Sequence, residues 1–286
     1  MLTLVLFNLT NGIILGLFYV LMALGVSLIL NLSNVINFAH GNFLALGGYF
    51  AFSLAPYLGY WGAFIVAPIL VAVIGLIVEQ TMIKRVYPRP HVYSLLLTFG
   101  IAQILQGGMT NYFGASGVSY NAPDLLSGVL NLGFMYLPVY RGFVIFAAII
   151  ICAVTWFLIE RTKLGALLRA ATENPDLVQS FGVNVPRLIA ITFAGGVALA
   201  AIAGVLAAPL YSVSPDMGEE LINTVFAVVV IGGMGSIGGA ILTGFGLGII
   251  QGFTDVFYPP GSAVVVFVVM AVVLLARPAG LFGKVA

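Results

Sequence analysis

The chain has 286 residues, of which 62% are hydrophobic and only 7% charged, and its formal net charge is +1. Its mean hydropathy of +1.17 and its repeated long uncharged runs exceed what a soluble core needs, which excludes a soluble globular protein. The runs are continuous rather than alternating, which favours helices over the strands of a membrane barrel. We therefore predict an all-α polytopic transmembrane helical bundle, in contact with membrane lipid and with no nucleic-acid partner.

Eight apolar spans follow one another along the chain. They are predicted at 8–30, 35–55, 61–80, 92–113, 142–159, 188–210, 221–254 and 262–276. The seventh is too long for one span of about 20 residues, so it should turn back and then counts as two, which makes nine spans. The turn is predicted at a glycine cluster, Gly232, Gly233, Gly235, Gly238 and Gly239, because glycine permits unusual backbone shapes. Beyond it, Gly244, Gly248 and Gly252 recur every four residues and predict a close helix-packing face.

Basic residues predict the orientation of these spans, because they favour the cytoplasmic side of a membrane. The cytoplasmic side is assigned to Lys84, Arg85, Arg89, Arg161, Lys163, Arg169, Arg187, Arg277 and Lys284. Only Arg141 then lies outside. The N-terminus is expected outside, together with the connections at 56–60, 114–141 and 211–220, and the C-terminus is expected in the cytoplasm.

A second irregular stretch, NLSNVINFAHGNFLALGGYF at 31–50, interrupts the early apolar runs with polar residues. Asn37, His40 and Asn42 straddle Gly41, which predicts a broken helix with polar groups at its break. Discontinuous helices in corresponding positions of two halves point to a transport pathway built from inverted repeats. We expect such pseudo-repeat halves at about 1–113 and 188–286.

Several function classes lack the residues that they need. No Asp, Glu, Lys or Arg falls well inside a predicted span, which disfavours a proton-coupled carrier. His40 is the exception that could reach membrane depth, and a structural, hydrogen-bonded histidine is favoured over a proton relay because no partner acid is found. The chain has no phosphate-loop, HExxH or GxSxG motif, so we expect no catalytic activity, no metal and no bound cofactor. Energy for transport must then come from a partner.

The stretch RAATENPDLVQSFGVNV at 169–185 is the one long polar passage inside the chain. Asn174 suits an N-cap, Pro175 the first helical position and Gly182 the left-handed residue after a helix, which predicts a short helix over 175–181. Its apolar residues Leu177, Val178 and Phe181 are expected on one side. A free helix of two turns is marginal in water, so it is either an amphipathic linker on the bilayer surface or a docking element for a cytoplasmic protein.

Four passages resemble one family, the LivH/LivM-type membrane subunits of branched-chain amino acid importers powered by ATP-binding cassettes, and the LivH side more closely. They are NVINFAHGNFLALGGYF at 34–50, ERTKLGALLRAATENPDLVQSFGVNV at 160–185, PLYSVSPDMG at 209–218 and VVVIGGMGSIGGAILTGFGLG at 228–248. The resemblance implies a single permease domain over 1–286 with a cytoplasmic coupling loop at 160–187. It also implies a bacterial inner-membrane location.

The resemblance further implies alternating access driven by partners. A periplasmic binding protein delivers an amino acid, two membrane subunits form the passage between them, and two cytoplasmic ATPase subunits, which hold the ATP and Mg, switch it. The second membrane subunit is expected to be LivM-like, or else a copy of this chain. Members of the family also carry urea and short-chain amides. The alternative function is therefore a self-contained channel or facilitator for a small neutral solute, and a membrane enzyme comes third.

Site residues follow from the same resemblance. The residues expected to couple to the ATPase are Arg169, Ala170, Glu173, Asn174, Leu177, Val178, Phe181 and Gly182. Another importer class has a glycine soon after an EAA motif, whereas Gly182 lies far beyond Ala171. The expected pathway residues are Asn37, His40, Asn42, Gly233 and Ser236. The acidic residues Asp216, Glu219 and Glu220 are expected either to contact the binding protein or to form a solvated acidic loop.

Overall fold

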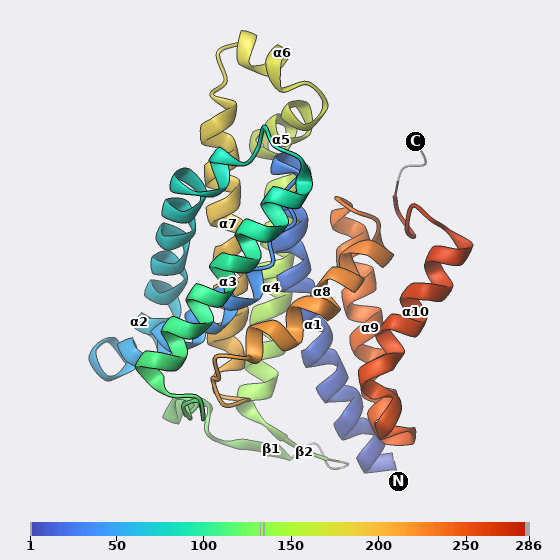
Figure 1. Ribbon diagram of the computed structural model, residues 1–286. Coiled ribbons are helices and arrows are strands. Elements are labelled where there is room, and N and C mark those ends of the chain that lie inside the picture. Colours follow the sequence, from blue (N-terminus) through green and yellow to red (C-terminus); the bar gives the residue numbers. More distant parts are fainter. Residues whose placement is uncertain (1, 132, 134, 284–286) are drawn as a thin grey trace.

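The computed structural model describes residues 2–131, 133 and 135–283 (Figure 1). The described residues form ten α-helices, which are α1 (Leu2–Ser33), α2 (His40–Thr81), α3 (His91–Phe113), α4 (Val139–Arg161), α5 (Lys163–Glu173), α6 (Pro175–Ser180), α7 (Val185–Ala207), α8 (Met217–Gly232), α9 (Ile237–Phe257) and α10 (Ser262–Ala276). Seven helices in the described part of the chain are long and apolar enough to cross a membrane. The predicted all-α polytopic bundle is thus confirmed.

The long segment at 221–254 does turn back, as predicted. The chain leaves α8 and enters α9 through a turn in which Gly233 and Gly235 have φ of 94° and 83°, a backbone shape that favours glycine. The connection predicted at 56–60 is a sharp break at Gly59, whose φ of 67° and ψ of 175° are non-helical. It separates the two helical parts of α2, which correspond to the second and third predicted spans.

Two elements were absent from the predicted order. α5 occupies the first part of the segment at 160–187, where only one short helix was expected. The segment at 114–141 contains a small antiparallel hairpin, β1 (Val129–Asn131) and β2 (Tyr136–Pro138), in which Leu130 pairs with Leu137. Lys284, one of the basic residues used for the orientation, lies outside the described residues.

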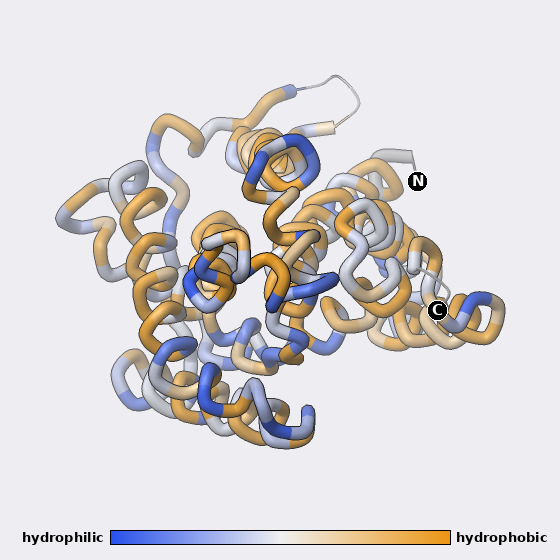
Figure 2. Tube along the Cα trace, turned by 90° about the horizontal axis from the view of Figure 1, so that it is seen from above, coloured by the Kyte–Doolittle hydropathy of each residue, from blue (hydrophilic) through white to orange (hydrophobic). Residues whose placement is uncertain are grey.

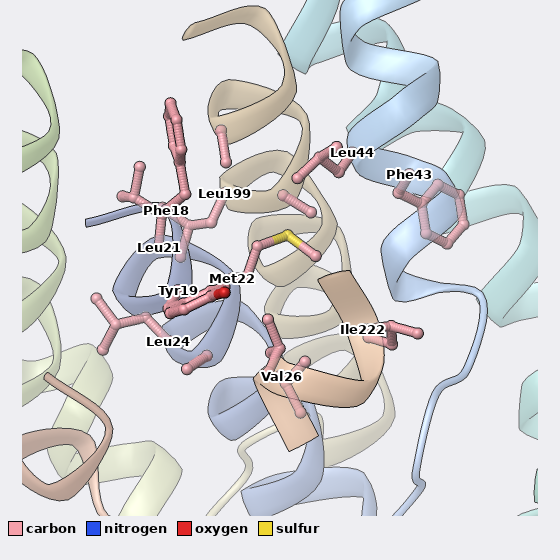
Figure 3. Packing of buried hydrophobic residues seen from close by; sticks show 14 of the residues in the cluster. Phe18, Tyr19, Leu21, Met22, Leu24, Val26, Phe43, Leu44, Leu199 and Ile222 are labelled. Carbon is pink, nitrogen blue, oxygen red and sulfur yellow. The ribbon is translucent and has the colours of Figure 1, made fainter. Parts of the chain in front are cut away.

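α1 and α7 form the centre of the bundle. In the most apolar stretch of α1, 78% of the residues are buried, and in that of α7, 61% are buried. Figure 3 shows Met22 and Val26 of α1 in one cluster with Leu44 of α2, Leu199 of α7 and Ile222 of α8. These large side chains come from segments far apart in the sequence, so burying them fixes how the helices are arranged.

The predicted packing face of α9 is confirmed against α1. A methyl group at Gly248 would lie 2.2 Å from the Cα of Gly16, and one at Gly252 would lie 2.8 Å from the Cα of Gly12. Small residues allow such close approach between helices in lipid, where dispersion contacts replace the hydrophobic effect.

The peripheral helices expose apolar side chains. Only 22% of the most apolar stretch of α4 is buried, and only 6% of that of α10. Seen from above, most of the helical trace is coloured as hydrophobic, with hydrophilic residues in short stretches (Figure 2). An exposed apolar surface of this extent suits contact with lipid.

The two ends of the bundle differ. Figure 1 shows α5 and α6 at one end and the β1–β2 hairpin at the other, where α1 also starts. Arg141, at the start of α4, lies at the hairpin end and donates a hydrogen bond to Asn11. The remaining described basic residues lie on connections or helix ends at the α5–α6 end. The charge asymmetry read from the sequence is therefore present in three dimensions.

Candidate functional site

Two helices of the bundle begin inside it. After α1 ends at Ser33 the chain is non-helical until α2 begins at His40, and after α7 ends at Ala207 helix resumes only at α8. The first turns of α2 and α8 touch, since a methyl group at Gly218 would lie 2.2 Å from the carbonyl oxygen of Gly41. Two chain breaks from distant parts of the sequence therefore meet.

This meeting point lies near the middle of the bundle. A methyl group at Gly25 of α1 would lie 2.5 Å from the carbonyl oxygen of Gly196 and 2.9 Å from the ring of His40. Gly196 is the middle residue of α7. Non-helical backbone at such depth is tolerated where protein or a water-filled cavity surrounds it.

The three polar residues predicted at the first break are all buried. Asn37 accepts a hydrogen bond from the backbone N–H of Ala39 at 3.1 Å, and Asn42 donates one to the carbonyl of Ala102 at 2.7 Å. Neither ring nitrogen of His40 has a hydrogen-bond partner of normal geometry among the described residues, although the backbone of Met22 lies nearby. His40 is thus buried as expected, but it lacks the well-formed hydrogen bond expected of a structural histidine.

Gly233 and Ser236 do not join this group. They lie in the turn between α8 and α9, where Gly233 packs against the backbone of Gly283 and the Ser236 hydroxyl accepts a hydrogen bond from the Gly239 N–H at 3.1 Å. Their observed roles are a tight turn and an N-cap. The five predicted pathway residues therefore form two separate groups.

The acidic residues of the 211–220 connection lie deeper than the sequence indicates. α8 begins at Met217, so Glu219 and Glu220 belong to its first turn, beside the break at Gly41. The connection thus folds back toward the first turn of α2, while the side chains of Asp216, Glu219 and Glu220 stay exposed. Carboxylates in the first turn of a helix are favoured by its dipole.

α3 adds polar residues that sequence reasoning missed. Gln106 donates a hydrogen bond to Asp216 at 2.6 Å and a longer one to Glu219 at 3.3 Å, while Gln103 is exposed on the same helix. Polar side chains on a membrane-spanning helix usually face protein or water rather than lipid. Two glutamines in an otherwise apolar span are the sequence signal that could have identified this face.

The segment at 160–187 forms two short helices that stand at one end of the bundle. Arg169 of α5 donates a hydrogen bond to the carbonyl of Ile159 at 2.9 Å and pairs with Glu160 at 3.4 Å. Gly165 allows the tight turn, since a methyl group there would lie 1.5 Å from the Ile159 carbonyl oxygen. These contacts hold α5 against the end of α4.

The predicted short helix is confirmed as α6. The Asn174 side chain accepts a hydrogen bond from the Leu177 N–H at 2.9 Å, Pro175 is the first helical residue, and Gly182 has φ of 84°. Removing this cap should cost about 1 kcal/mol. We expect Asn174→Ala to speed amide hydrogen exchange in α6 roughly fivefold, because exchange reports local opening.

The matched control for that measurement is Asn184, which caps α7 by accepting a hydrogen bond from the Arg187 N–H at 3.0 Å. Asn184→Ala should speed exchange at the start of α7 and leave α6 unchanged. Equal exchange in α6 for wild type and Asn174→Ala would show that tertiary contacts, not the cap, hold the helix.

The apolar residues of α6 divide between two surfaces. Val178 is 7% exposed and packs in a small cluster with Leu168, Val185 and Leu188 of this same chain. Leu177 is 54% exposed and Phe181 is 80% exposed. The one-sided arrangement expected from the sequence was therefore wrong, because Val178 anchors α6 to its neighbours while the other two face outward. Of the other predicted coupling residues, Arg169, Ala170, Glu173, Asn174 and Gly182 are all exposed.

Asn31, near the end of α1, connects three parts of this end of the bundle. Its side-chain amide donates to the Gly235 carbonyl at 2.7 Å, and its backbone carbonyl lies 3.2 Å from the Thr172 hydroxyl of α5, which also donates to the Leu168 carbonyl at 2.9 Å. A cavity of about 510 Å³ lies beside it, lined by residues of α1, α5, α7 and the α8–α9 turn and by Tyr87. Burial raises the pKa of Tyr87, as does its hydrogen bond to Glu79 at 2.8 Å. α5 is thus bonded to α1, which in turn is bonded to the α8–α9 turn.

A many-span helical bundle with two helix ends meeting at its centre defines a membrane protein of the transporter class. The chain belongs to the family described as branched-chain amino acid transport system / permease component, which matches residues 8–276. No solved structure matches the fold.

Curated relatives cover nearly the whole chain. One is the high-affinity branched-chain amino acid transport system permease protein BraD of Pseudomonas aeruginosa, 31% identical over 97% of this chain and 95% of its own length. The corresponding LivH protein of Escherichia coli strain K12 is 29% identical over 96% of this chain and 94% of its own length. A LivM protein of the same organism is 26% identical over 76% of this chain and 57% of its own length. These matches confirm the family predicted from the four sequence passages, on its LivH side.

Proposed function

We propose that the chain is the permease subunit of an ATP-driven importer for branched-chain or other amino acids, which moves its solute by alternating access. Whole-length similarity to permeases named for branched-chain amino acid transport supports the solute class. The comparisons do not favour a self-contained facilitator. The single structural observation that carries the dependence on a partner is the α5–α6 segment, which stands at one end of the bundle (Figure 1) and carries the exposed side chains of Leu177 and Phe181.

The proposed partners at that end are two cytoplasmic ATPase subunits. One of the two docks on the α5–α6 end of this chain. Large apolar side chains at 54% and 80% exposure outside the spanning bundle suit burial in a partner's pocket. The bonds from α5 through Asn31 to the α8–α9 turn provide a contiguous connection from this surface to helices of the bundle interior. ATP and Mg belong to the partners, and this chain hydrolyses nothing.

A second permease subunit is proposed to cover the exposed polar face of α3 and α8. Gln103, Glu219 and Asn223 are exposed there, at a depth where lipid contact would be costly. Similarity to LivM as well as LivH supports a related chain as the partner, with a second copy as the alternative. The passage then runs between the two subunits, beside the helix break that holds Asn42.

The proposed location is the inner membrane of a bacterium, with the basic α5–α6 end in the cytoplasm and the hairpin end outside. α1 then starts outside and α10 ends inside. A periplasmic binding protein approaches the hairpin end, toward which the connection bearing Asp216, Glu219 and Glu220 opens.

Reconstitution tests this proposal. The permease pair, the ATPase subunits and the binding protein are placed together in liposomes, and uptake of radiolabelled leucine and urea is measured with and without ATP. Leucine uptake is expected only with ATP, the ATPases and the binding protein together. Solute entry with the permease chain alone would support a facilitator instead.

A further inference from the structure

A small cavity lies between α2, α3 and α8, with a volume of about 110 Å³. Its polar lining consists of four carboxamides and one carboxylate, which are Asn42, Gln103, Gln106, Asn223 and Glu219. At about 30 Å³ per water, it holds a few waters or one small polar group. Polar side chains from three separate helices thus converge on one partly open space, where Gln103, Glu219 and Asn223 are exposed.

This cavity lies at the middle of the bundle. Asn42 bonds to Ala102, which is the middle residue of α3, and it is next to Gly41, where the first turns of α2 and α8 meet. At this level of a spanning bundle, such a concentration of exposed polar groups is costly against lipid unless a polar solute or a partner covers it.

A wider cavity of about 670 Å³ connects it with the hairpin end. Gln103, Gln106 and Glu219 line both cavities, and the wider one continues to Thr110 and Asn111 in the last turn of α3. Glu219 therefore stands where the wide, open outer cavity meets the narrow inner one.

The charge at this junction has no partner within the protein. Gln106 donates to Asp216 and Glu219, but a neutral amide does not cancel their charge. Among the described residues neither carboxylate forms an ion pair. The side chains of Gln103 and Asn223 make no hydrogen bond in the described part of the chain, so their N–H groups are available to an anionic group. The cavity thus offers the Glu219 carboxylate to a cationic group and the N–H groups of Gln103 and Asn223 to an anionic group.

We propose that this cavity binds the headgroup of the transported amino acid, with Glu219 pairing with its ammonium group and Gln103 and Asn223 donating hydrogen bonds to its carboxylate. The inference rests on the proposed function and extends it, because it assigns the contact residues for the zwitterion within the passage. The solute's apolar side chain then faces Phe38, Phe99 and Ile222, which line the same cavity. Urea and neutral amides lack the ammonium group and can only donate N–H hydrogen bonds to Glu219, without an ion pair.

The first test measures the charge preference of the cavity without transport. Cys152 is the one cysteine of the chain and is first replaced by alanine, so that only the introduced thiol reacts. In the complete importer, the Asn223→Cys thiol is then modified by a cationic methanethiosulfonate, the 2-aminoethyl reagent, or by the anionic 2-sulfonatoethyl reagent. The cationic reagent is expected to react about tenfold faster or more, because Glu219 concentrates cations there. Glu219→Gln should remove the preference.

The matched control is Asp124→Asn, which removes an exposed carboxylate on the connection at the hairpin end, outside both cavities. It should leave the preference intact. Equal rates for the two reagents in the Asn223→Cys protein, or a preference that survives Glu219→Gln, would overturn the inference. Since labelling needs no uptake, this result stands apart from whether the complex imports leucine.

The second test uses uptake. With saturating binding protein, Glu219→Gln should lower leucine uptake at least about tenfold, while the ATPases still copurify and the binding protein is still captured by the complex. Glu219→Asp should restore part of the uptake because it keeps the charge. Unchanged uptake in Glu219→Gln, or a loss explained by weaker capture of the binding protein, would contradict a headgroup site. Failure of the wild-type complex to import leucine would count against the proposed function instead.

Discussion

Phe181→Glu is expected to abolish ATP-dependent leucine uptake and copurification of the ATPase subunits, while the chain stays in the membrane. Phe181 is 80% exposed at the end of α6, so its replacement removes little packing within the chain. An aromatic anchor at the centre of an interface typically contributes about 2 kcal/mol or more, which corresponds to a loss of affinity of roughly thirtyfold. A buried, unpaired carboxylate adds a further desolvation cost. Leu177→Glu should act in the same direction.

The control for this prediction is Gln179→Glu, which adds the same charge at another exposed position of α6. It should leave copurification and uptake near the wild-type level. Copurification is measured by quantitative pull-down of the tagged permease from membranes, and insertion by its abundance in the membrane fraction. If Phe181→Glu still binds the ATPases with wild-type affinity, α6 is an interfacial linker rather than a docking element.

Local signals predicted α6 well because its ends depend on residues within a few positions. Asn174, Pro175 and Gly182 fix the start and end of the helix through their own hydrogen-bonding and backbone preferences. Which of its apolar residues is buried could not be predicted in the same way. Val178 is buried by Val185 and Leu188 of α7, and that contact depends on how the chain folds back after Gly182.

The spans were predictable from hydropathy, but the depth at which helices begin was not. The polar residues around His40 and the glycines near 233 predict irregular backbone, and both places are irregular. No local sequence signal indicates that the connection before α8 folds back into the bundle. This return brings Gly218 into contact with Gly41. Glu219 therefore looked like a surface residue. The inverted repeat itself, with halves at about 1–113 and 188–286, remains a prediction.

The meeting of α2 and α8 explains why glycine stands at both positions. Every atom near the two missing side chains belongs to backbone, so no rotamer change can make room for a methyl group. A methyl group at Gly41 would lie 2.2 Å from the Gly218 carbonyl oxygen, and one at Gly218 would lie 2.2 Å from the Gly41 carbonyl oxygen. Either the helices separate or one of them shifts along its axis. Both changes would move Asn42 relative to Glu219.

Gly218→Ala and Gly41→Ala are therefore each expected to destabilise the folded chain by about 1–3 kcal/mol or more, the usual cost of overpacking, and to reduce uptake severely. The midpoint of thermal unfolding of the purified complex should fall by several degrees. Gly195→Ala is the matched control, since a methyl group at this exposed glycine of α7 meets nothing within 4 Å. It should raise stability by up to about 1 kcal/mol through helix propensity. If Gly218→Ala unfolds at the same temperature as Gly195→Ala and still imports leucine, the two first turns are not in contact in the working transporter, and the cavity between them loses its fixed wall.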